Sequence, residues 1–215
     1  MIWILALGGG LVSGMASSFI APLGIAEWLI FLNPIPGICF AALLLLVMQN
    51  LGKNSGNLLR KVLFVIFSIA AYIAAFWATL YSSETLAHTF CYSMPESLFG
   101  RCDEQIGFFI GGVAGALILI LSAKFIFKTF TFGQAGILIV SGGILGILGV
   151  SAQTALADII EQGPEMGLGW LARSTGMFPV LFMIWQVGMV LLITYFLKRN
   201  IEDSKINVGI PPLLR

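Results

Sequence analysis

Six apolar stretches, separated by shorter polar segments, run through the 215-residue chain. A helix that crosses a bilayer needs about 20 mostly apolar residues, because about 30 Å of hydrocarbon is crossed at about 1.5 Å per residue. The pattern therefore predicts an all-α, polytopic transmembrane helix bundle in residues 1–200, followed by a polar tail at 201–215. The predicted spans are residues 2–20, 35–51, 62–81, 106–127, 136–155 and 178–197.

The basic residues favour one orientation of this bundle. Of the 11 Lys and Arg residues, all but Arg101 and Arg173 lie in or beside the segments 51–61, 128–134 and 198–215. Short loops rich in Lys and Arg stay on the cytoplasmic side of a membrane. We therefore expect both chain ends and the tail in the cytoplasm, with the protein a multi-pass component of a bacterial inner (plasma) membrane.

Composition agrees with lipid as the main solvent of this chain. Hydrophobic residues make up 59% of the sequence and charged residues 10%, and the mean hydropathy is +1.00. Soluble domains carry about 25% charged residues. The net charge of +1 offers no large field to attract nucleic acid. The expected partners are the lipid bilayer and, in one hypothesis below, other membrane protein subunits.

Small residues four apart predict close helix packing. They are Gly10, Gly14, Gly107, Gly111, Gly115, Gly142 and Gly146. Such residues line one face of a helix and let two backbones approach closely, although the same face can also slide or line a substrate path. The glycine-rich segments 8–14 and 110–115 also look alike, as the first helices of two inverted three-span repeats would.

Cys91 and Cys102 lie in the same predicted outside loop. An oxidising compartment favours a disulfide between them. Two alternatives remain: a redox-active pair, although the CxxC spacing typical of such pairs is absent, and a zinc site of His88, Cys91, Cys102 and Asp103. Because the chain has one His and no second close Cys pair, we expect the disulfide and no bound metal.

A few polar residues fall in or near the spans and form a candidate solute or cation site: Glu27, Asn33, Gln153 and Gln186. Glu27 and Asn33 belong to segment 21–36, which prolines interrupt and which either lies in the outer interface or re-enters the membrane. Carboxylates inside a membrane are usually functional. The simpler interpretation is that Glu27 is exposed to solvent and that the two glutamines make hydrogen bonds between helices.

No residue cluster specifies a catalytic mechanism. Walker A, Rossmann, HExxH and Gly-x-Ser-x-Gly patterns are absent, so no catalytic residue and no cofactor is expected. In size, span number and inside termini the chain resembles the substrate-binding membrane subunits of vitamin uptake systems, and it equally fits other small inner-membrane proteins. Two hypotheses follow: a small-solute carrier or its substrate-binding subunit, and a non-catalytic structural or assembly subunit. A membrane enzyme with outside carboxylates or thiols is a third, weaker hypothesis.

Overall fold

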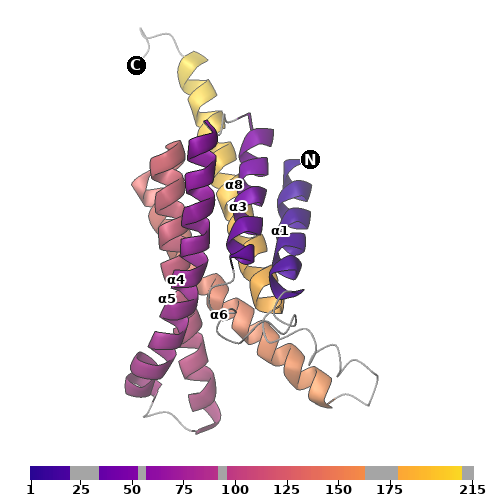
Figure 1. The fold of residues 1–215 in the computed structure, drawn as a ribbon, viewed down its shortest axis with the longest axis vertical. Coiled ribbons are helices and arrows are strands. Elements are labelled where there is room, and N and C mark those ends of the chain that lie inside the picture. The colour runs from indigo at the N-terminus through magenta and orange to yellow at the C-terminus, as the bar shows by residue number, and fades with distance from the viewer. Residues whose placement is uncertain (20–33, 53–56, 92–95, 163–178, 210–215) are drawn as a thin grey trace.

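The described part of the chain is built from helices alone. The computed structural model describes residues 1–19, 34–52, 57–91, 96–162 and 179–209, and these contain no strand. The helices are α1 Ile2–Phe19, α3 Ile35–Asn50, α4 Leu58–Cys91, α5 Glu96–Phe127, α6 Phe132–Gln162 and α8 Pro179–Gly209 (Figure 1). The predicted all-α class is confirmed at this level.

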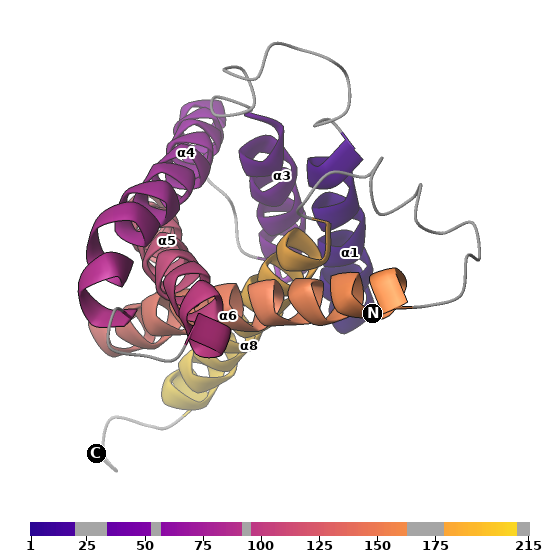
Figure 2. The ribbon, with the colours of Figure 1, turned by 90° about the horizontal axis from the view of Figure 1, so that it is seen from below.

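Successive helices run in opposite directions and close into a ring. The start of α1 and the end of α8 lie at the same end of the bundle (Figure 1). Each helix packs against the next in chain order, and α8 packs back against α1 (Figure 2). The only other contact among these helices is a small one between α3 and α8.

This ring does not fit two inverted three-span repeats. A two-fold axis in the membrane plane reverses the sense in which helices follow one another around the bundle. In a ring that keeps one sense throughout, the first three helices cannot be rotated onto the last three in that way. The likeness between residues 8–14 and 110–115 therefore reflects a shared glycine content and not a structural repeat.

Four of the described helices are long and apolar enough to cross a membrane: Leu58–Thr85, Cys102–Phe127, Phe132–Leu156 and Val180–Ser204. The other two apolar segments, in α1 and α3, are shorter. With 16 residues, α3 would extend about 24 Å, which is less than the hydrocarbon thickness of about 30 Å.

The helices continue beyond the predicted spans. With 34 residues, α4 extends about 50 Å, so part of it must project from a bilayer. At the other end of the chain, α8 continues to Gly209, past residue 200, and the division of the chain into a membrane domain and a tail at that residue stays a prediction. Ion pairs with i, i+4 spacing support this polar extension, between Lys198 and Glu202 at 3.8 Å and between Arg199 and Asp203 at 3.9 Å.

Small residues form the contact between α4 and α5. A Cβ atom at Gly115 would lie 2.9 Å from the Cβ of Ala75, and one at Gly107 would lie 3.1 Å from the carbonyl oxygen of Thr79. A Cβ at Gly111 would overlap the Thr79 side chain. On α4 the complementary face carries small residues four apart: Ala71, Ala75, Thr79 and Ser83. In lipid, where apolar association has little driving force, such close packing holds helices together.

The remaining predicted packing glycines also lie at contacts between helices. At Gly142 a Cβ would lie 2.5 Å from the Cβ of Ala116, and at Gly146 it would overlap the Phe108 carbonyl, so both sit against α5. In α1, a Cβ at Gly10 or Gly14 would come within 2.9 Å or 2.6 Å of the α8 backbone. The glycines thus join α1 to α8 and α5 to both α4 and α6.

Candidate functional site

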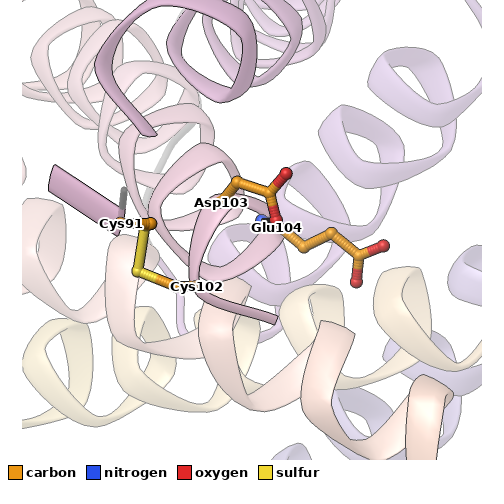
Figure 3. Close-up of a disulfide and its surroundings, with 4 residues drawn as sticks. All are labelled: Cys91, Cys102, Asp103 and Glu104. Atoms are coloured by element: carbon orange, nitrogen blue, oxygen red, sulfur yellow. Dashed lines mark hydrogen bonds between the residues drawn. A yellow bond between two sulfur atoms is a disulfide. The ribbon is translucent and has the colours of Figure 1, made fainter. Parts of the chain in front are cut away.

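Cys91 and Cys102 form a disulfide at the end of the α4–α5 hairpin. Cys91 is the last residue of α4, Cys102 lies in the second turn of α5, and their Cα atoms are 6.0 Å apart (Figure 3). The predicted pair is therefore at disulfide distance. Asp103 and Glu104 project away from the two sulfur atoms (Figure 3). Because the bond uses both thiols, the alternative zinc site would lose two of its ligands.

The proposed solute-site residues fall in different parts of the fold. Glu27 and Asn33 lie outside the described residues. Gln153 is in α6, where its side-chain oxygen accepts a hydrogen bond of 3.4 Å from the backbone N–H of Leu181. This satisfies one of the free amides in the first turn of α8. Gln186 is in α8, only 2% exposed. The common site stays a prediction, and the bond of Gln153 joins two helices, as the simpler interpretation of this residue predicts.

Aromatic side chains near Gln186 in the sequence connect α8 to α3 and α4. The indole N–H of Trp185 donates a hydrogen bond of 3.1 Å to the carbonyl oxygen of Gly142, which ties α8 to α6. The Trp185 ring lies 5.5 Å from that of Phe40 in α3. On the preceding turn of α8, the centre of the Phe182 ring lies 5.7 Å from that of Tyr72 in α4. The indole N–H of Trp185 thus already has a hydrogen-bond acceptor within the bundle.

The enclosed space between α3, α4, α5 and α8 is small. A cavity of about 10 Å³ lies among apolar side chains that include Leu44, Phe64, Ile120 and Leu197. A single water needs about 10–15 Å³, so this cavity leaves no room for a solute. The part of the interior that the structure describes here is packed like a protein core.

A polar cluster at the opposite end of the bundle from the disulfide joins α8 to the α5–α6 turn. The side chains of Asn200 and Gln134 exchange hydrogen bonds of 2.8 and 3.0 Å, and the Asn200 amide also donates to the carbonyl oxygen of Thr129 at 2.9 Å. Thr131 and Gln134 make reciprocal bonds of 3.1 and 3.3 Å that cap the start of α6. The T-x-x-Q pattern of this capping box was readable in the sequence, and it was missed.

Charged groups separate along the bundle axis. Six of the described basic residues lie towards the end that holds the start of α1, where Glu202 and Asp203 also lie: Arg60, Lys61, Lys124, Lys128, Lys198 and Arg199. Glu84 of α4 and Asp103 and Glu104 of α5 lie towards the disulfide end, which also holds Arg101 of α5. Within the ranges given above, no three His, Cys, Asp or Glu side chains gather into a metal-binding group. The chain matches no protein-family model, and the searches of curated proteins and of solved structures found no similar protein.

Proposed function

We propose that the chain crosses the membrane six times, with the basic end of the bundle in the cytoplasm. The four long apolar helices support membrane insertion, and the alternating helix directions are those that six spans require. The separation of basic and acidic ends supports the orientation, because Lys and Arg are retained on the cytoplasmic side. In this proposal α1 and α3 cross at the short limit of span length. Location in a bacterial inner membrane stays a prediction.

We further propose that the protein is a non-catalytic structural or assembly subunit of a larger membrane complex. The observation that carries this proposal is the tight packing of the described helices: glycine contacts bring the backbones together, and the cavity among the apolar side chains of α3, α4, α5 and α8 is only about 10 Å³. A bundle packed in this way can still bind another protein through its outer surface.

The outward face of α4 is the best candidate for that contact. Only 17% of the membrane-spanning window of α4 is buried, compared with 50% for α5. Exposed apolar side chains run along it from Leu59 through Phe67 to Trp77. The same helix continues beyond its apolar span, and the disulfide at Cys91 links its end to α5. A partner with one membrane span and an outside domain could therefore contact a single continuous helix.

The first test asks whether water reaches the interior. In a Cys39→Ala background, Gln186→Cys is treated in membranes with an impermeant maleimide from each side, and Ser204→Cys, at an exposed position, serves as the reactive control. A structural subunit leaves Gln186→Cys unlabelled while Ser204→Cys reacts. Labelling of Gln186→Cys, with protection by a solute, would establish a carrier instead.

The second test asks what covers α4. A photo-crosslinking amino acid at Phe67 or Trp77 should give one discrete protein adduct in native membranes. The matched control is Ile144, an exposed apolar position of α6. Lipid adducts alone at all three positions would contradict a partner on α4.

A solute carrier is the second candidate, and one observation favours it. Gln186 is a long polar side chain at 2% exposure within the candidate span Val180–Ser204, next to Trp185 in the chain. Polar side chains at this depth often mark a substrate path. The maleimide experiment decides between the two proposals.

A further inference from the structure

A shallow hollow at the α5–α6 turn combines two lysines with three phenylalanines. It is lined by Lys124, Phe125, Lys128, Phe130 and Phe132 and has a volume of about 330 Å³. It lies at the basic end of the bundle, where α5 ends at Phe127 and α6 begins at Phe132. In the proposed orientation this is the level of the cytoplasmic lipid headgroups.

The local backbone and packing present both ammonium groups at this hollow. Lys128 has φ of 52°, the left-handed conformation that commonly follows the last turn of a helix. Lys124, one turn earlier in α5, places its Nζ atom 2.8 Å from the centre of the Phe132 ring. The aromatic ring holds the first ammonium group by a cation–π contact.

The charges of the hollow are not balanced by nearby acids. Its lining carries two positive charges and no carboxylate. By contrast, Lys198 and Arg199 at the same end of the bundle each pair with an acid one turn along α8. An anion in the hollow would therefore complement two cations that pair with no carboxylate in the described part of the chain.

The rings define which anion fits. Phe125 is 68% exposed and Phe132 is 75% exposed, whereas Phe130 is buried and forms part of the core. Exposed phenyl rings beside lysines at a helix end suit a ligand that is anionic at one end and apolar at the other. We propose that this hollow binds the phosphate headgroup of an anionic phospholipid, with its acyl chains against Phe125 and Phe132. This proposal needs membrane insertion and is independent of the structural-subunit role.

Native mass spectrometry of the purified chain in detergent tests the site with phosphatidylglycerol and phosphatidylcholine at matched concentrations. We expect wild type to retain the anionic lipid selectively. Lys124→Ala/Lys128→Ala should lose roughly 10- to 30-fold in affinity for phosphatidylglycerol, because two lysine–phosphate contacts are removed. Lys124→Arg/Lys128→Arg should keep the binding, since the charges remain.

The control variant Lys198→Ala/Arg199→Ala removes the same charge from the same end of the bundle. An equal loss of lipid in this control would show general attraction and overturn the site. Equal retention of phosphatidylcholine by wild type would also overturn it. Displacement of the lipid by inorganic phosphate at equal concentration, with Phe125→Ala/Phe132→Ala unaltered in lipid binding, would assign the hollow to a free anion. Unchanged melting temperatures of the variants ensure that any loss concerns binding and not folding.

Discussion

At the scale of single residues, the free space around a glycine decides whether a larger side chain can replace it without disturbing the helix packing. A side chain at Gly111 would meet α4, whereas one at Gly8 in α1 would meet nothing within 4 Å. Both glycines sit in apolar helices and look equivalent in composition. The difference between them depends on which neighbour each faces.

Gly111→Leu should therefore push α4 and α5 apart and destabilise the protein by roughly 1–3 kcal/mol or more. Gly8→Leu is the matched control and should have little effect. The melting temperatures of both variants in detergent provide the measurement. If the two variants melt alike, the glycine contact does not hold these helices together.

Lys128 is the one described non-glycine residue with a positive φ, at 52°. A Cβ atom costs roughly 1 kcal/mol or more in this conformation. Lys128→Gly should consequently be more stable than Lys128→Ala by about 1 kcal/mol, since both variants lose the same charge. Thermal unfolding of the pair measures the difference. Equal stability, or a more stable alanine variant, would mean that the turn does not hold this backbone conformation.

At the scale of elements, the hydropathy pattern located the apolar stretches of the chain but did not predict where the helices end. Polar residues such as Glu84 and Glu202 mark the edges of apolar stretches, yet α4 and α8 pass through them without a break. A helix needs no apolar residues once it leaves the membrane, and i, i+4 ion pairs are enough to extend it. Helix boundaries were therefore the least accurate part of the prediction.

Contacts between elements were predicted unevenly. The four-residue spacing of glycines such as Gly111 and Gly142 predicted that they lie at contacts between helices. The α4 face of Ala75 and Thr79 was missed, because alanine and threonine occur in helices for many reasons. A hydrogen bond between helices from Gln153 was predicted, but its partner Leu181 was not, since sequence alone does not bring α6 next to the start of α8.

The joint between α8 and the α5–α6 turn depends on Asn200. Asn200→Ala should destabilise the protein by roughly 1–3 kcal/mol, because it removes the donor to the Thr129 carbonyl and the acceptor of the Gln134 side-chain N–H. Asn50→Ala is the control, since the Asn50 amide bonds only within its own helix, to Leu46 at 2.9 Å. A double-mutant cycle with Gln134→Ala in detergent measures the coupling. Zero coupling would contradict this joint.

The disulfide stabilises the α4–α5 hairpin. Cys91→Ser should lower the free energy of unfolding by roughly 3 kcal/mol in oxidising buffer, because the unfolded chain gains conformational entropy once the disulfide no longer closes its loop. In reductant, wild type and variant should unfold at the same temperature. A similar loss in both buffers would assign the effect to packing of the buried Cys91 side chain.

At the scale of the whole molecule, the order of the helices and the distribution of charge support one arrangement. The helices form a ring in chain order, basic residues such as Lys124 and Arg199 gather at one end, and the disulfide lies at the other. The overall class followed from the apolar pattern alone. The tight packing between α3, α4, α5 and α8 did not follow from it, because the identity of a span does not reveal how tightly it packs.

Thiol labelling of intact cells tests this arrangement most directly. In a Cys39→Ala background the remaining cysteines are Cys91 and Cys102. An impermeant maleimide should label neither residue before reduction, and it should label the partly exposed Cys102 after reduction with an impermeant reductant, since the hairpin lies outside and its thiols are paired. Labelling that requires permeabilised membranes even after reduction would place the hairpin inside and contradict the proposed orientation.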